Sequence, residues 1–167
     1  LAVQGYEVYG IGKIEDIFAR RGVTHSRHTG SNADGISSLL ELIAQDRASD
    51  LIFANLVDFD MHYGHRNDVE GYARALEEFD GALPAILSKL RPDDLLVITA
   101  DHGCDPTHPG TDHTREYVPV LAWSSRMPGP VALGTLPTFA DVGATVYEHI
   151  TRGSFGVGRS FLSLLNL

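Results

Sequence analysis

The chain has 167 residues, of which 43% are apolar and 21% are charged, and it contains a single cysteine. This composition is typical of a globular domain large enough to bury one core, and a lone cysteine excludes an internal disulfide, which fits a reducing cytoplasm. The formal net charge of -9 argues against nucleic acid as the main partner, and no apolar run approaches the roughly 20 residues of a membrane span.

Strands are expected at four places along the chain. Residues 6–11 are β-rich, and the nearly continuous apolar runs at 51–57 and 95–99 predict strands covered on both faces. Residues 117–122 also read as a strand, in which Pro119 favours an edge or a bulge. The polar stretch 23–35 is expected to be a loop.

Helices are expected between these strands. They are expected at 14–22, 34–46, 69–90 and 138–150, and apolar residues recur at helical spacing in the second and third of these ranges. Asp68 is a plausible cap of the third helix, which we expect to be interrupted or bent at Pro84. Alternating strands and helices predict an α/β fold with an open, mostly parallel sheet and helices on both faces. In such sheets, ligands bind at the carboxyl ends of the strands.

Acidic and imidazole side chains follow two of the predicted buried strands. Asp60 and His65 follow the strand at 51–57, and the strand at 95–99 is followed by Asp101, His102 and, further on, His113. Mixed carboxylate and imidazole ligands suit Mn²⁺ or Zn²⁺ better than Ca²⁺. Five ligands exceed what one catalytic metal usually takes from protein, so we expect two cations that share one phosphate. Such cations would also let an acidic chain bind phosphate.

Plainer interpretations exist for single residues in this region. A lone aspartate at a strand end is more often a turn or cap residue, and the remaining histidines are expected to be solvated or to lie beside the site: His25, His28, His62, His108 and His149. Cys104 follows the Asp-His-Gly run and is a potential nucleophile, but nothing in the sequence indicates an activated thiolate, so a bystander thiol is expected.

Several segments together resemble the phosphopentomutases, metal-dependent enzymes of the alkaline-phosphatase superfamily. The similar segments are IGKIEDIF, SNADGI, NLVDFDMHYGHRND, ITADHGCDPTHPGTDHTREYVPVLAW and TFADVGATV. TADHG alone marks only the wider superfamily, whereas the spacing of DFDxxxGHR and the GTDHTREYVPV segment point to the pentose enzyme. The resemblance implies interconversion of ribose or deoxyribose 1-phosphate and 5-phosphate through a phosphorylated enzyme.

The resemblance also implies roles for individual residues. Asp60, His65 and His113 would hold one Mn²⁺, and Asp101 and His102 would contribute to the other. Lys13, Arg66 and Arg115 would contact phosphate, although a solvated turn lysine and salt bridges of the two arginines to Asp68 or Glu116 are equally good interpretations.

The chain begins at Leu1 rather than Met and enters a strand almost at once, so we expect it to be a fragment. The resemblance implies that residues 1–167 are the C-terminal part of the catalytic domain of a cytoplasmic enzyme. In the resembling family, the threonine that carries the phosphoryl group, one metal ligand and an inserted cap domain come from earlier segments. Two alternatives remain open. One is another enzyme of the superfamily, such as a phosphoglycerate mutase or a phosphatase, and the other is a metal-binding fragment without turnover when isolated.

Overall fold

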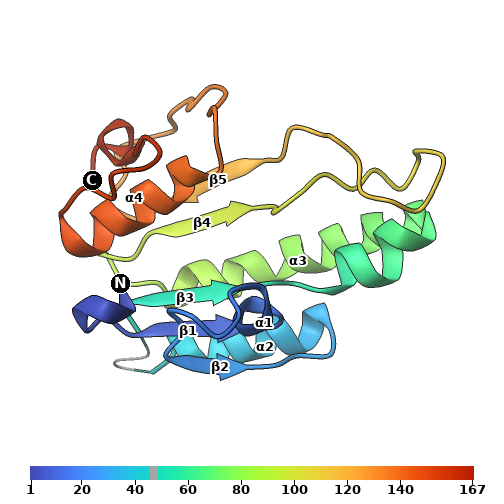
Figure 1. The fold of residues 1–167 in the computed structure, drawn as a ribbon, viewed down its shortest axis with the longest axis horizontal. Coiled ribbons are helices and arrows are strands. Elements are labelled where there is room, and N and C mark those ends of the chain that lie inside the picture. The colour runs from blue at the N-terminus through green and yellow to red at the C-terminus, as the bar shows by residue number, and fades with distance from the viewer. Residues whose placement is uncertain (46–48) are drawn as a thin grey trace. The chain divides into compact units, whose positions relative to one another are not determined.

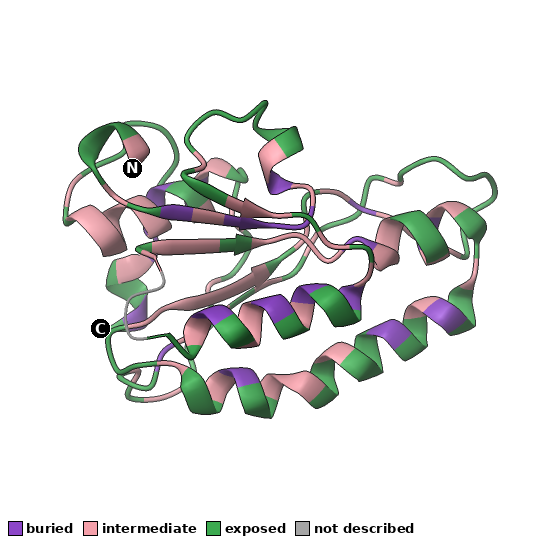
Figure 2. Ribbon diagram, turned by 90° about the horizontal axis from the view of Figure 1, so that it is seen from below, coloured by how far each residue is buried: buried purple, intermediate pink, exposed green. Residues whose placement is uncertain are grey.

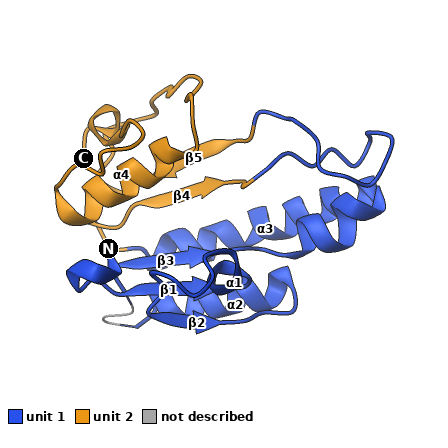
Figure 3. Ribbon diagram, viewed as in Figure 1, with its two compact units in different colours: residues 1–90, 102–117 blue, residues 91–101, 118–167 orange. Residues whose placement is uncertain are grey.

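The computed structural model describes residues 1–45 and 49–167 and contains two compact units (Figures 1 and 3). Unit 1 comprises residues 1–90 and 102–117, and unit 2 comprises residues 91–101 and 118–167. In the part of the chain that is described, none of the helices combines the length and the apolar character that a bilayer crossing requires.

Unit 1 is built on a parallel sheet of three strands in the order β2-β1-β3: β1 (Val8–Ile11), β2 (His25–Arg27) and β3 (Leu51–Ala54). Helix α1 (Ile14–Ile17) connects β1 to β2, and α2 (Asn32–Ile43) connects β2 to β3 on the other side of β1. Because parallel crossovers are right-handed and these two run in opposite directions across the sheet, α1 and α2 cover opposite faces. The expected α/β architecture is thereby confirmed.

Strand β2 lies within residues 23–35, where we expected a loop. Its residues are polar, so no apolar pattern marked it. It forms because Tyr9 pairs with His25 and because Thr24 exchanges two hydrogen bonds with the backbone of Val8. An edge strand with little buried surface is specified by its neighbour rather than by its own composition.

The helices of unit 1 differ from expectation mainly at their ends. Helix α1 stops at Ile17 because Ala19 and Arg20 adopt positive φ angles of 49° and 61°. Helix α2 starts two residues earlier than predicted, with the Ser31 side chain accepting a hydrogen bond from the Asp34 N–H. It ends at Ile43, with Ala44 as its C-cap residue, and the predicted end near Asp46 lies outside the described residues.

Helix α3 (Val69–Lys89) is capped by Asp68, as predicted, through a hydrogen bond from the Gly71 N–H. The helix continues through Pro84 without interruption. Figure 2 shows buried positions on β1 and at intervals along the long helices, whereas β2 and β3 are only partly buried. The apolar core of unit 1 includes Val8, Ile11, Ile14, Leu42, Val57, Ala75 and Ile86.

Unit 2 contains an antiparallel pair of strands, β4 (Leu96–Thr99) and β5 (Val120–Trp123). Strand β5 starts directly after Pro119, which cannot donate a ladder hydrogen bond. Helix α4 (Ala140–Thr151) and a short turn, η4 (Leu162–Leu165), complete the unit. The expectation of a solvated His149 is wrong, because its Nε2 lies 3.0 Å from the carbonyl oxygen of Asp93 and its Nδ1 is buried.

Candidate metal centre

Asp60 lies in a π-helical turn that follows β3. Residues Phe59–Tyr63 (η2) form this turn, and a 3₁₀ turn, Gly64–Arg66 (η3), follows it. Short π-helical segments are rare and frequently occur at functional sites. The turn brings Nε2 of His65 to 3.2 Å from Oδ1 of Asp60. Sequence reasoning placed these two residues in a loop and missed the turn.

The loop over residues 103–116 brings His113 back to His102. Its ends are joined by a β-bridge between Gly103 and Thr114, in which the Thr114 N–H donates to the Gly103 carbonyl. A Cβ at Gly103 would lie 2.5 Å from the Thr114 carbonyl oxygen, so the close approach requires glycine. The Thr114 hydroxyl also accepts from the Asp105 N–H at 2.8 Å. As a result, the His102 and His113 rings stack with centroids 3.8 Å apart.

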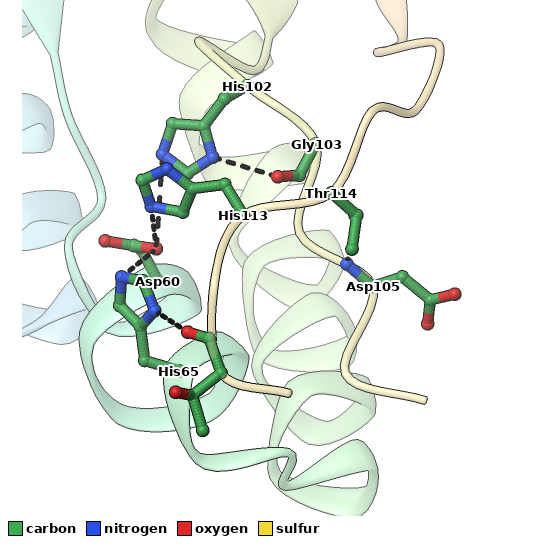
Figure 4. Close-up of polar contacts among 8 residues, drawn as sticks. Asp60, His65, His102, Gly103, Asp105, His113 and Thr114 are labelled. Carbon is green, nitrogen blue, oxygen red and sulfur yellow. Dashed lines mark hydrogen bonds and ion pairs between the residues drawn. The ribbon is translucent and has the colours of Figure 1, made fainter. Parts of the chain in front are cut away.

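Four of the five predicted ligands therefore converge on one point (Figure 4). Oδ1 of Asp60 lies 3.2 Å from Nε2 of His113 and 4.0 Å from Nε2 of His102, in addition to its contact with His65. The rings of His65 and His113 have centroids 4.8 Å apart. Asp60, His102 and His113 each offer one ligand atom, and these atoms all lie within 4.8 Å of one another.

The chemistry of these donors fits a divalent cation. Oδ1 of Asp60 is buried and accepts no hydrogen bond from the described residues. Nδ1 of His65 faces the Thr111 carbonyl and Nδ1 of His102 faces the Gly103 carbonyl, so both ring nitrogens donate protons to these oxygens. In the neutral rings, Nε2 then presents a lone pair toward a carboxylate oxygen. Such an arrangement is repulsive unless a proton or a metal cation lies between these atoms, and imidazoles whose other ring nitrogen donates to a carbonyl group are common at metal sites.

Asp101 belongs to unit 2 and immediately precedes His102 in the chain, and its side chain is exposed. Its assignment as a ligand of a second cation stays a prediction. The same holds for the predicted division of the other four residues between two cations.

Asn67 is a further residue that holds the site together, and sequence reasoning missed it. It adopts a left-handed conformation with φ of 54°, and its side-chain nitrogen donates to the carbonyl oxygens of Pro106 and His108 at 3.2 and 3.0 Å. Asn67 and His65 thus both connect the turns after β3 to the loop over residues 103–116, which we call the histidine loop. The only available signal was an asparagine two residues beyond a candidate ligand, which is too common a pattern to indicate this role.

Cys104 packs against Gly64, which precedes the predicted ligand His65. A Cβ at Gly64 would lie 2.3 Å from the Cys104 sulfur, which shows how closely the two chain segments approach. Burial raises the pKa of the Cys104 thiol, and the charges of Asp60 and Asp105 add to this effect. Burial likewise raises the pKa of the nearby Tyr72 phenol. A raised pKa keeps the thiol protonated, which favours the bystander interpretation over a nucleophile.

Of the three predicted phosphate contacts, Arg66 and Arg115 each lie within two residues of a predicted metal ligand in the chain, whereas Lys13 follows β1. Lys13 precedes α1 at the carboxyl end of β1, where the preceding turn requires Gly12 (φ 78°) because a Cβ there would lie 2.3 Å from the Asn55 carbonyl oxygen. Arg66 and Arg115 are exposed, and in the described ranges 1–45 and 49–167 neither forms an ion pair with Asp68 or Glu116. Their roles toward phosphate stay predictions.

Comparison with curated proteins finds close relatives. The chain is 56% identical over 163 residues to a phosphopentomutase of Caldanaerobacter subterraneus, which covers 98% of this chain and 41% of the relative. It is 57% identical to a phosphopentomutase of Symbiobacterium thermophilum and 52% identical to that of Thermotoga petrophila, over 94% and 99% of this chain. The chain spans about 40% of the length of these relatives.

Comparison with solved structures supports the fold. A phosphoglycerate mutase of Leishmania mexicana, crystallised at low cobalt concentration, matches 96% of this chain and 38% of its own with a TM-score of 0.72 at 17% identity. A protein of Pyrococcus horikoshii matches 74% of this chain with a TM-score of 0.60. At these identities the likeness concerns the fold alone, which is the alkaline-phosphatase-like α/β arrangement expected from the sequence. A protein-family model matches residues 7–152, and the chain belongs to the Metalloenzyme superfamily that this model describes.

Proposed function

We propose that this chain is the C-terminal part of the catalytic domain of a phosphopentomutase, which interconverts (deoxy)ribose 1-phosphate and 5-phosphate. The convergence of Asp60, His65, His102 and His113, in a chain 56% identical to a phosphopentomutase, carries the proposal. The other elements of the proposal come from the family: a phosphoryl-carrying threonine and one metal ligand from an earlier segment, an inserted cap domain, and a cytoplasmic location.

Two divalent cations, most suitably Mn²⁺, would occupy the centre. Asp60, His65 and His113 would hold one of them, and Asp101 and His102 would contribute to the other. When bound, the cations supply positive charge that neutralises the phosphate and orients the reacting oxygens.

The protein's own groups would perform the remaining tasks. The carbonyl groups of Thr111 and Gly103 hold the His65 and His102 rings in the tautomer that turns Nε2 to the centre. Exposed Arg66 and Arg115 can reach a phosphate in solution and bind it through paired N–H donors, and Lys13 would add a point charge. The raised pKa of the Cys104 thiol favours a phosphoryl acceptor elsewhere in the complete protein.

The test uses the complete protein, assayed on ribose 5-phosphate, phosphoglycerate and an aryl phosphate with Mn²⁺ present. We expect turnover of the pentose phosphate, and a fall of several orders of magnitude for Asp60→Asn and His65→Ala, together with loss of bound Mn²⁺. His108→Ala removes an exposed histidine from the same loop and should change neither quantity. Preference for phosphoglycerate or the aryl phosphate would assign the protein to another activity of this fold.

The 167-residue chain by itself is expected to show no turnover, since the proposed nucleophile lies outside it. Comparing the isolated chain with the complete protein, and with the chain after addition of the missing segment, separates a metal-binding part from a complete catalyst. Turnover by the isolated chain would contradict the proposed location of the nucleophile.

A further inference from the structure

Asp58 and Asn32 form a reciprocal pair of hydrogen bonds between the start of α2 and the segment that leads into the π-helical turn. The Asn32 N–H donates to Oδ2 of Asp58 at 2.8 Å, and the Asp58 N–H donates to the side-chain oxygen of Asn32 at 2.9 Å. Each residue therefore uses its side chain to hold the backbone of the other. The two residues are 26 positions apart in the sequence.

The pair is shielded from solvent. Asn32 is 5% exposed, and the Asp58 side chain is 13% exposed. The carboxylate lies at the N-terminus of the 12-residue helix α2, where it accepts from an N–H group that has no partner within the helix. Breaking either hydrogen bond would leave a buried polar group unpaired, which costs far more than losing an exposed contact.

The position of this pair in the chain connects it to the metal centre. β3 ends at Ala54, and Asp58 is the residue that precedes the π-helical turn, already in the α region with φ -70° and ψ -32°. Asp60 follows two residues later. The hydrogen bonds thus fix where the turn begins relative to the sheet and α2, and thereby fix the direction in which the Asp60 carboxylate leaves the backbone.

We propose that Asp58 and Asn32 are positioning residues that set the Asp60 carboxylate for cation binding, without themselves contacting the cation. The inference rests on the proposed metal site. It assigns Asp58 a role that depends on its hydrogen-bonding shape and not on its charge. Because Oδ1 of Asp58 accepts no hydrogen bond within the described residues and lies 3.8 Å from Nε2 of His62, the experiment also tests the alternative that Asp58 is a direct ligand.

The experiment measures Mn²⁺ affinity of the complete, metal-stripped protein by titration, at a temperature at which every variant is folded by circular dichroism. Binding by the wild-type protein is measured first and tests the proposed function alone. We expect Asp58→Ala and Asn32→Ala each to weaken Mn²⁺ binding about tenfold, as is usual when a group that orients a ligand is removed. The double variant should lose no more Mn²⁺ affinity than either single variant, because each substitution disrupts the same pair of hydrogen bonds.

Two further variants separate positioning from direct ligation and from general destabilisation. Asp58→Asn keeps an oxygen that accepts from the Asn32 N–H and should retain Mn²⁺ affinity within about threefold, as judged against the tenfold loss above. Ser31→Ala removes the hydroxyl that caps α2 and lowers helix stability without touching residue 58, so Mn²⁺ affinity should be unchanged.

Wild-type affinity in both alanine variants would overturn the proposal. A loss in Asp58→Asn as large as in Asp58→Ala would also overturn it, since it would show that the charge of Asp58 acts at the cation. Should the alanine variants not fold, the exchange Asn32→Asp/Asp58→Asn decides the matter. Asn32→Asp alone places two carboxylates together and should weaken binding, and the exchanged pair should recover it. If the exchanged pair did not recover Mn²⁺ affinity, the proposed positioning role of Asp58 and Asn32 would be overturned.

Discussion

Oδ1 of Asp60 lies 3.2 Å from Nε2 of His113, although the two residues belong to different loops and are brought together only by the folding of unit 1. The carboxylate comes from the π-helical turn after β3, and the imidazole comes from the bridged loop after His102. Anything that shifts one loop against the other should therefore change the metal centre, and the contacts between the loops offer specific tests.

Gly64→Ala should damage the centre by steric conflict. The new Cβ would lie 2.3 Å from the Cys104 sulfur and 3.0 Å from the Phe59 carbonyl oxygen, so the two loops must separate. We expect a loss of about 1–3 kcal/mol in the free energy of unfolding and weaker Mn²⁺ binding, measured by denaturant titration and by metal titration.

Adding Cys104→Ala to the Gly64→Ala variant should partly restore its stability and its Mn²⁺ binding, because the second substitution removes the sulfur that the new methyl group meets. Gly81→Ala is the matched control, since Gly81 lies within α3 with open space around its Cβ position, and alanine should stabilise that helix by up to about 1 kcal/mol. If Cys104→Ala brought no recovery, the conflict would lie elsewhere.

Asn67→Ala should loosen the histidine loop. The substitution removes two hydrogen bonds, to the Pro106 and His108 carbonyls, and places alanine in a left-handed conformation. We expect a loss of about 1–3 kcal/mol in stability, along with reduced Mn²⁺ affinity. Asn67→Gly avoids the strain of alanine in a left-handed conformation but does not restore the two lost hydrogen bonds. Equal Mn²⁺ affinity in wild type and Asn67→Gly would show that the side chain does not hold the loop.

Removing the metal should destabilise the protein. The Nε2 lone pairs of His65 and His102 face the Asp60 carboxylate, and a cation that binds only the folded state adds stability according to its concentration relative to its dissociation constant. At free Mn²⁺ about 100 times that constant, we expect chelation to cost about 2.7 kcal/mol. Thermal unfolding with and without chelator measures this. A variant Asp60→Asn should show a smaller difference, because Asp60 is proposed to hold only one of the two cations.

Cys104 should react slowly with alkylating reagents in the metal-free protein. Burial raises the pKa of its thiol above that of an exposed cysteine, which is roughly 8.5, so the thiolate appears only at more alkaline pH. The folded state therefore holds this proton more tightly than the unfolded state. The associated stability is fully present below the unfolded pKa and is lost as pH rises through the folded pKa.

The measurement is the alkylation rate of the Cys104 peptide across this pH range, compared with that of a free thiol. If the alkylation rate of Cys104 rose at the same pH as that of the free thiol, or at a lower pH, the predicted direction of the pKa shift would be contradicted. It would also reopen the question of a nucleophilic Cys104.

The sequence by itself determined the features that depend on short-range patterns. The continuous apolar run before Asp60 marks β3, the run before Asp101 marks β4, and the helical spacing after Asp68 marks α3. Because Asp60 and His102 follow the carboxyl ends of two predicted strands, their mixed donor chemistry was also visible without coordinates. The prediction that these strands are covered on both faces is wrong, since none of the residues of β3 and β4 is buried.

Only the tertiary structure decided how these groups meet. The polar strand β2 exists because β1 pairs with it, the π-helical turn gives Asp60 its direction, and Asn67 and Asn32 act through hydrogen bonds to residues far along the chain. Local propensity and periodicity reach only a few residues in either direction. A hydrogen bond that spans 26 or 41 residues leaves no trace in such patterns, so it appears only when the folded chain is seen.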